Sequence, residues 1–572
     1  MLQLIALAYF LVGSVIATSL PTGTTLNGTY AGVYSTSFEQ DFFLGIPYLQ
    51  APVNDRRFHP ADSLTSSWNG TRNATAYAPS CVGYGPSDRP DDMSEDCLYL
   101  NIVRPHQNTT TPSDLLPVVI YFHGGGFSGG SACDGRYNLS SFVARSVKQD
   151  QPVIAVSFNY RLSAWGFLYS NQIRDTGATN VGLRDQRYAL QWVQENIAGF
   201  GGDPQQVTVW GQGAGASSVG FQLTAYAGRD DGLLRGAILQ SGNPVPARGL
   251  NGTQYFQPLY DALTQQVYPS STFALEYGMV PGKDTCWVSP DRMACLRTVP
   301  FAEMNAAINA TSPHGWFPVI DGDIVSQQPS RSLYTRKFVP VPIILGAATD
   351  EGTAQMPAKV EIVTDEDFAD LVANPQSYGV APGIALPQVL VNQITAAYAN
   401  VSSVPAVKAR LHQGDATVIA NRRQACATWA RNNVTTYCYR WNAALGEGQR
   451  TAQHGDDLPF VFDNTRGTGY EHRPLNTESL VELAAEVSGS WVSFVATLNP
   501  NAWKTATNSS VVATSITSKG GIPVWPQYGA PHEYALVFQA NGTSYVEEDT
   551  WRATPIRLIN GPPSGIAVAY QR

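Results

Sequence analysis

Short, almost uninterrupted apolar runs recur along the middle of the chain and alternate with stretches of helical periodicity. The apolar runs lie at residues 117–122, 153–158, 207–210, 236–240 and 342–345. Between the second and third runs, residues 184–196 instead place Trp192 and other apolar residues at helical spacing. Runs that are apolar on both faces are typical of parallel strands covered on both sides by helices. The pattern predicts an α/β fold with a large, mostly parallel central sheet flanked by helices.

Two long segments, residues 252–330 and 365–421, lack this strand rhythm and have the pattern of helices joined by loops. In open α/β sheets, insertions of this kind lie beyond the carboxyl ends of the strands, where ligands bind. We therefore expect these helical insertions to form the walls of a gorge.

The amino terminus has the pattern of a secretory signal. Residues 1–17 form a short apolar run without Lys or Arg that ends in small residues. Such a run is typical of a cleaved leader and is short for a membrane anchor. We expect a signal peptide at 1–17, a single domain over 18–572, no membrane span, and passage through the secretory pathway.

Glycosylation sequons and cysteine spacing agree with an oxidising, secretory environment. Sequons of the form N-x-[ST], which predict a glycosylated surface, occur at Asn27, Asn69, Asn73, Asn108, Asn138, Asn251, Asn309, Asn400, Asn433, Asn508 and Asn541. Six of the seven cysteines fall into close pairs, which we expect to form the disulfides Cys81–Cys97, Cys286–Cys295 and Cys426–Cys438. Cys133 is left over and is expected to be a buried free thiol.

The charge of the chain excludes some classes of partner. A formal net charge of −9 disfavours nucleic acid, because phosphate binding needs a basic face. No Cys/His cluster has the spacing of metal ligands, so no metal and no cofactor are expected. A small-molecule substrate or ligand remains the expected partner.

The most informative position is Gly213. Residues 207–216 read as an apolar strand, a turn of small residues and the start of a helix. This is the setting of a nucleophile elbow, G-x-S-x-G, with glycine at the position of the serine. An elbow residue is held in a strained conformation that costs a non-glycine residue about 1–3 kcal/mol, and glycine relieves it.

Several motifs in order resemble those of one family, the type-B carboxylesterases. The motifs are Phe43–Tyr48, Ser94–Asn101, Asn159–Arg161, Gly199–Pro204 and Gln240–Gly242. This family of α/β-hydrolases also includes cholinesterases, secreted fungal lipases and the non-enzymatic neuroligins. The resemblance runs from about residue 20 to Trp525 and Pro526, and it implies an α/β-hydrolase fold.

The resemblance also implies an oxyanion hole. The sequence His123-Gly124-Gly125-Gly126-Phe127 is similar to the family's oxyanion loop, so Gly125 and Gly126 would offer backbone N–H groups to a developing oxyanion. Ala214, which follows the nucleophile position, would give a third N–H. The alternative is that the two glycines only shape a turn.

A proton-transfer pair is implied in the same way. Glu351, in Thr349-Asp350-Glu351-Gly352, matches the triad acid, and His454, in the stretch 453–460, matches the triad histidine. As alternatives, Glu351 is a surface acid, or His454 is a structural remnant bonded to it. The neighbouring Asp456 and Asp457 are expected to cap a helix or to be solvated.

The chain departs from the family pattern at the elbow itself. Gln212 stands where the family usually has an acid, and loss of that charge makes an imidazolium at His454 less favourable. Removal of a serine nucleophile costs about a millionfold in kcat in a well-studied protease, so covalent ester hydrolysis is expected to be negligible. Ser217 and Ser218 follow in the helix and are expected to point away from the elbow.

Three functions remain open from the sequence. The first is a repurposed enzyme that uses His454 and Glu351 for general acid/base chemistry, namely cyclisation, elimination or water addition, on an apolar oxygenated small molecule such as a secondary metabolite. The second is a non-catalytic, neuroligin-like binding protein. The third is an ordinary carboxylic ester hydrolase in which a substitution has replaced the serine at position 213.

Overall fold

The computed structural model describes residues 20–561 except 86–91, 107–113, 246–249, 358, 381–385, 446–450, 505–520 and 541–543. The predicted signal peptide at 1–17 lies outside the described residues. The sequons at Asn108, Asn508 and Asn541 also lie outside them. Among the described helices, none is long and apolar enough to cross a bilayer.

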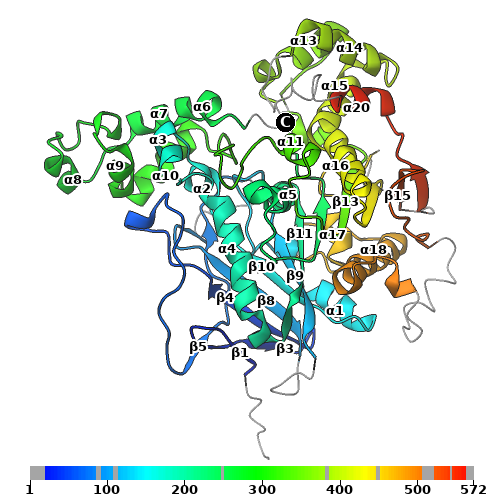
Figure 1. The fold of residues 1–572 in the computed structure, drawn as a ribbon, viewed down its shortest axis with the longest axis horizontal. Helices are drawn as coiled ribbons and strands as arrows, with labels where there is room; N and C mark the ends of the chain where they lie inside the picture. Colours follow the sequence, from blue (N-terminus) through cyan, green and yellow to red (C-terminus); the bar gives the residue numbers. More distant parts are fainter. Residues whose placement is uncertain are drawn as a thin grey trace, which may run out of the picture.

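An 11-stranded mixed sheet forms the centre of the described chain (Figure 1). From edge to edge its strands are β16 (Tyr545–Glu548), β15 (Tyr534–Phe538), β14 (Thr436–Trp441), β13 (Ile343–Ala348), β12 (Gly236–Gln240), β11 (Gly202–Gln212), β9 (Leu116–Phe122), β10 (Ile154–Phe158), β8 (Tyr99–Pro105), β4 (Gln40–Pro47) and β3 (Val33–Ser35). Every pairing from β15 to β10 is parallel, whereas the outer pairs are antiparallel. The predicted α/β class is confirmed.

The five apolar runs of the sequence are the five central strands β9 to β13. In β9 the side chains alternate between two cores, so Val118 and Ile120 face one side of the sheet and Val119 and Tyr121 the other. Because both faces are covered, each strand is apolar at nearly every position. The outer strands carry more polar residues, which is why the apolar pattern did not predict them.

Helices cover both faces of the sheet. Helices α4 (Val181–Asn196), α5 (Ala214–Gly228) and α16 (Ala420–Arg431) pack on the face of Val118. Helices α1 (Ser140–Lys148), α17 (Leu458–Val461) and α18 (Glu478–Thr497) pack on the opposite face (Figure 1). Helix α4 contains the predicted helix 184–196, with Trp192 buried as expected.

The two segments without strand rhythm are helical, as predicted. The first packs in a hydrophobic core that it shares with residues such as Phe127 and Phe221, and the second has a separate core. The first carries α6 (Gly252–Tyr255), α7 (Gln257–Gln266), α8 (Ser271–Glu276), α9 (Arg292–Thr298), α10 (Phe301–Thr311) and α11 (Pro329–Tyr334). The second carries α13 (Asp365–Ala373), α14 (Gln388–Ala399) and α15 (Pro405–Gly414), and a π-helical turn, Asp415–Ile419, joins it to α16. Figure 1 shows α6–α10 and α13–α15 as two groups of helices at the upper end of the molecule.

The remaining short elements lie outside the central sheet and its main covering helices. The strands among them are β1 (Thr22–Thr24), β2 (Thr29–Ala31), β5 (Thr71–Asn73), β6 (Ser80–Cys81) and β7 (Met93–Ser94). The helices among them are α2 (Ser163–Phe167), α3 (Asn171–Asp175), α12 (Gly352–Gln355) and α20 (Ala553–Ile559). Among these helices, α2 is fully buried, while α12 lies beside the cavity described below.

All three expected disulfides are present, and they join Cys81 to Cys97, Cys286 to Cys295, and Cys426 to Cys438. Cys133 is free, as expected, but it is half-buried rather than fully buried. Burial raises the pKa of its thiol to about 11, so the reactive thiolate is scarce at neutral pH.

Several of the sequons lie on the surface. The exposed asparagines are Asn69, Asn73, Asn251, Asn309, Asn400 and Asn433. Asn27 and Asn138 are half-buried and their side chains are hydrogen-bonded, Asn27 to Leu64 and Ser66 and Asn138 to the amide of Ser140.

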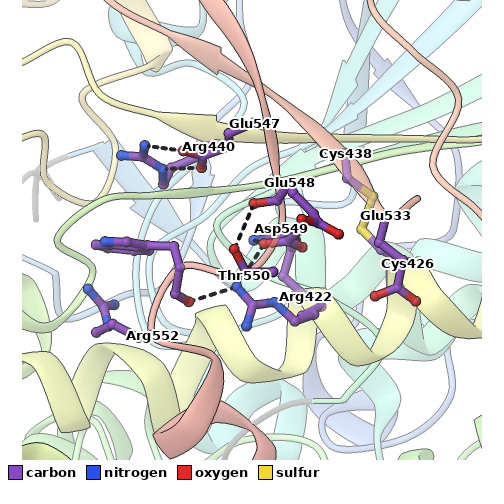
Figure 2. Close-up of polar contacts among 12 residues, drawn as sticks. Arg422, Cys426, Cys438, Arg440, Glu533, Glu547, Glu548, Asp549, Thr550 and Arg552 are labelled. Carbon is purple, nitrogen blue, oxygen red and sulfur yellow. Dashed lines mark hydrogen bonds and ion pairs between the residues drawn. A yellow bond between two sulfur atoms is a disulfide. The ribbon is translucent and has the colours of Figure 1, made fainter.

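A buried ion-pair cluster ties the carboxyl-terminal strands to α16 (Figure 2). Asp549 accepts hydrogen bonds from Arg422 at 3.0 Å and from Arg423 at 2.8 Å, and Arg440 on β14 pairs with Glu547 on β16 at 2.8 Å. Burial alone would raise the pKa of Asp549, but the two guanidinium groups lower it well below its usual range. Charge pairing therefore fixes the last strands against the helix layer.

Candidate active site

Gly213 lies in the sharp turn between β11 and α5, with φ 58° and ψ −122°. Its N–H donates to the carbonyl of Gln240 at 2.9 Å, and its carbonyl accepts from the amide of Ser217 at 3.0 Å. A Cβ on the neighbouring Gly215 would lie 2.0 Å from the carbonyl oxygen of Phe122, so that position has no room for a side chain. The run of small residues is therefore explained by close packing of the turn against β9.

Glu351 and His454 form a hydrogen-bonded pair beside this turn. The His454 Nδ1 and the Glu351 Oε2 atoms are 2.6 Å apart. The carboxylate is fully buried, and its other oxygen accepts the amide of Ala348 at 2.6 Å, which holds it in place. The two residues are hydrogen-bonded, which fits both a proton-transfer pair and a structural remnant, whereas the alternative that Glu351 is a surface acid is wrong.

The other nitrogen of the imidazole, Nε2, faces position 213. A Cβ built on Gly213 would lie 3.0 Å from the Nε2 atom of His454. The amide of Gln212 also lies 3.0 Å from the same nitrogen and donates to it when His454 is neutral with its proton on Nδ1. Gln212 thus contacts the proton-accepting atom of His454 directly, which the sequence did not reveal.

The protonation of His454 reflects the acids around it. Burial of the ring lowers the pKa of the imidazole, but attraction to Glu351, its hydrogen bond, and the charges of Asp457 and Asp456 outweigh this effect. The net result is a pKa raised above the usual histidine value.

Asp457 corrects one expectation of the sequence. It occupies the N-cap position of α17, as expected, but its side chain makes no capping hydrogen bond and is not solvated. The carboxylate is buried and accepts hydrogen bonds from Gln240 at 2.7 Å and from Tyr439 at 3.0 Å. Burial raises the pKa of its carboxyl group. Asp456 does accept a local backbone hydrogen bond, from Gln453 at 2.8 Å.

The predicted oxyanion residues lie on the same cavity as Gly213 and His454. Among the described residues, the N–H groups of Gly125, Gly126 and Ala214 donate no hydrogen bond. Gly125 has φ 111°, and a Cβ there would lie 2.1 Å from the carbonyl oxygen of Gly129, so only glycine fits. The loop therefore presents unpaired donors where the resemblance implies them.

The cavity has a volume of about 650 Å³, within the range of small-molecule sites. His314 from the first insertion and Thr417 and Val418 from the second line it, so both insertions contribute walls as predicted. Ser217 lines it as well, contrary to the expectation that it points away, whereas Ser218 is buried and bonded to Gln186. The sequence did not predict that His314 lines the cavity, because nothing in its flanking sequence matched a motif.

Comparison with known proteins shows the family of the chain. The profile of the Carboxylesterase family matches residues 13–552. A secreted lipase of Arthroderma benhamiae is 31% identical over 500 residues, which cover 83% of this chain and 82% of the relative. Lipase 4 of Diutina rugosa is 34% identical over 398 residues, 63% of this chain and 67% of the relative. The solved structure of Aspergillus niger EstA has a TM-score of 0.75 and 27% identity, over 95% of this chain and 98% of that chain. With this sheet, elbow and set of relatives, the chain belongs to the carboxylesterase family.

Proposed function

We propose that this carboxylesterase-family protein carries out general acid/base chemistry without an acyl-enzyme. The observation that carries the proposal is the environment of the His454 Nε2 atom. It faces an elbow residue that has no side chain, while the other ring nitrogen is held by a buried carboxylate at 2.6 Å. A hydroxyl nucleophile is absent at that position, but a positioned base remains.

The proposed mechanism begins with neutral His454. Its Nδ1–H donates to Glu351, which fixes the tautomer and leaves the Nε2 lone pair free to accept a proton. A substrate displaces the Gln212 amide from Nε2 and places its carbonyl oxygen against the N–H groups of Gly125, Gly126 and Ala214. Removal of a proton next to the carbonyl gives an enolate, which those three donors stabilise. In a cyclisation the enolate attacks an electrophilic carbon of the same molecule, and protonated His454 gives its proton to the alkoxide that forms. In an elimination the enolate expels a leaving group, and His454 loses its proton to solvent. For addition of water, His454 takes its proton from the attacking water instead, and the same donors hold the oxyanion.

The substrate we propose is an apolar, oxygenated small molecule, such as a secondary metabolite. The cavity mixes apolar side chains, such as Phe127, Leu445 and Leu458, with the polar groups of the loop. The named relatives are lipases, which supports a substrate that carries a carbonyl group on an apolar body. The apolar leader and the secreted relative support a location in the secretory pathway or outside the cell.

The experiment is hydrogen–deuterium exchange at the carbon next to the carbonyl of 4-phenylbutan-2-one, followed by mass spectrometry. Wild type should accelerate the exchange, and His454→Gln should lower the rate by about 100-fold or more, the usual contribution of a general base. His532→Gln is the matched control, because His532 is exposed and does not line the cavity. Equal exchange in wild type and His454→Gln would refute the proposal.

A serine-directed fluorophosphonate separates this proposal from ordinary ester hydrolysis. The proposal expects no labelling of wild type, because position 213 carries no hydroxyl. Labelled protein would favour an acyl-enzyme on another serine. Absence of both labelling and exchange would favour a binding protein.

A further inference from the structure

A second imidazole lies on the cavity, and no motif pointed to it. His314 belongs to the loop after α10, its side chain is exposed, and it lines the same cavity as His454. Its Nδ1 atom lies 3.0 Å from the Oγ atom of Ser128, at the end of the oxyanion loop. We propose that His314 is the general acid that complements the base His454, an inference that rests on the proposed function.

The hydrogen bonds of Ser128 fix the orientation of His314. In the imidazolium form both ring nitrogens carry a proton, so Nδ1–H donates to the Ser128 oxygen, 3.0 Å away, and the Ser128 hydroxyl can turn to the carbonyl of Gly125 at 3.5 Å. In this arrangement the Nε2 atom is the one left for a ligand. Among the described residues, it has no hydrogen-bond partner. When the ring is an imidazolium, Nε2 carries the proton that can be given away, and the neutral Nδ1–H form that remains keeps its bond to Ser128.

The position of His314 relative to the oxyanion loop suits this role. A Cβ built on Gly126 would lie 3.8 Å from the Ser128 Oγ atom. The same Oγ atom lies 3.0 Å from the Nδ1 atom of His314, so Ser128 links the ring to the oxyanion loop. His454 stands at the elbow instead, with Nε2 3.0 Å from the corresponding point on Gly213. A carbonyl oxygen bound to the loop thus has one imidazole at the elbow and another at the loop's end.

Two such groups allow a β-hydroxyketone to lose water. His454 Nε2 takes the proton from the carbon between the carbonyl and the carbinol, and the oxyanion loop holds the enolate oxygen. As the enolate collapses, the carbon–carbon double bond forms and the carbon–oxygen bond to the hydroxyl breaks. The Nε2–H of the His314 imidazolium protonates the leaving hydroxide, which departs as water. His454 then holds one extra proton and His314 lacks one, and exchange with solvent restores both.

Ser128 could instead be regarded as a nucleophile activated by His314, since a serine within hydrogen-bond reach of a histidine is the signature of such pairs. The geometry argues against this role. The side chain of Ser128 is buried, with the residue 6% exposed, and in the imidazolium form that the proposal requires the ring donates to Ser128 and cannot act on it as a base. We therefore assign Ser128 as a positioning residue for the imidazole.

The kinetic test uses 4-hydroxy-4-phenylbutan-2-one in deuterated water and follows two processes on the same molecule. Exchange next to the carbonyl reports the base, and formation of the conjugated enone reports the acid. At saturating substrate, where weaker binding does not affect the rate, His314→Gln should keep the exchange rate within about twofold and lower dehydration by about 100-fold, as expected for loss of one general acid. Ser128→Ala should lower dehydration alone, with recovery in Ser128→Thr, whereas His454→Gln should lower both. An equal loss of exchange and dehydration in His314→Gln, or no loss of either, would overturn the proposal.

A binding test does not depend on turnover. The enol of 1-phenylbutane-1,3-dione presents two oxygens with the spacing of the carbonyl and the leaving hydroxyl. Calorimetry should give at least a tenfold weaker Kd for His314→Gln than for wild type, and no change for His532→Gln. Equal affinity in His314→Gln and wild type would refute the assignment of His314 even if His454 proves to be a base. Conversely, weaker binding by His314→Gln together with no exchange by wild type would contradict the proposed function but not the contact between His314 and the ligand. Fluorophosphonate labelling of Ser128 would overturn the assignment of His314 as an acid and would show instead that Ser128 is a nucleophile activated by His314.

Discussion

At the scale of single residues, the site is defined by what position 213 lacks and by what surrounds it. Gly213 relieves the strain of a left-handed turn, and it leaves the proton-accepting nitrogen of His454 facing the cavity. Gln212 adds a neutral amide against that nitrogen. The chemistry we propose therefore depends on one missing oxygen and one missing charge.

A serine at the elbow should restore hydrolysis. In Gly213→Ser the new hydroxyl would lie against the Nε2 atom of His454, because a Cβ there is 3.0 Å from it, so a small adjustment of the ring is needed. We expect measurable release of p-nitrophenol from p-nitrophenyl butyrate, above a wild-type rate close to background. Gly213→Ala is the matched control for the added Cβ. A Gly213→Ser protein that is folded but as inactive as Gly213→Ala would mean that the dyad and the loop do not act together.

A carboxylate at position 212 should shift the pH dependence. In Gln212→Glu the negative charge next to the imidazole favours its protonated form and raises the pKa of His454 further. A base works only when neutral, so the acid limb of the exchange rate should move to higher pH, by about one unit. Gln212→Met, which has similar length and no charge, is the control. In this variant the acid limb should stay close to its wild-type position, because no charge is added beside His454. Movement of the acid limb to lower pH in Gln212→Glu would contradict the contact between residue 212 and the imidazole of His454.

At the scale of elements, the hydrophobic pattern and the sequence motifs predicted different parts of the molecule. The pattern predicted β9 to β13 because these strands are buried on both faces. It missed β14, Thr436–Trp441, which is buried but contains two tyrosines and an arginine. Glu351 and His454 were accessible to prediction because each lies in a recognisable motif. His314 was not, because a loop from an insertion brings it to the cavity through tertiary packing alone. Asp457 was misjudged because burial of an acid depends on distant partners, here Gln240 and Tyr439.

The ion-pair cluster between α16 and the last strands should carry much of the stability of that region. Asp549→Asn leaves the buried charge of Arg422 without its carboxylate, and loss of one partner of a buried pair costs about 3–5 kcal/mol. Because the pKa of Asp549 is lowered in the folded protein, wild type keeps this contribution above the ordinary carboxyl pKa and loses it as the pH falls toward the lowered value. Urea unfolding at pH 7 would measure the difference.

The control for that prediction is a surface pair. Arg56 and Asp62 lie 3.3 Å apart, with side chains 46% and 64% exposed, so Asp62→Asn should cost about 1 kcal/mol or less. A similar cost for Asp549→Asn and Asp62→Asn would show that the buried cluster contributes no more than an exposed ion pair.

At the scale of the whole molecule, the cavity joins segments that are far apart in the sequence. The oxyanion loop, the elbow, the histidine loop and both insertions all supply lining residues. A ligand bound there contacts several parts of the chain at once and binds only the folded state.

Binding should therefore raise the temperature of unfolding. At a concentration of 100 times its Kd, a ligand adds about 2.7 kcal/mol to the free energy of unfolding. The enol of 1-phenylbutane-1,3-dione should produce this shift in wild type by differential scanning fluorimetry. In Ser217→Trp an indole would occupy part of the cavity, and the shift should disappear. An equal shift in both proteins would place the ligand elsewhere.

The unpaired amides of Gly125, Gly126 and Ala214 have one more consequence, for the resting protein. Backbone N–H groups that have no acceptor among the described residues would attract small anions to the cavity that Gly125, Gly126 and Ala214 line. Acetate or chloride in a buffer would then compete with substrate, and the choice of counter-ion becomes part of the chemistry to be measured.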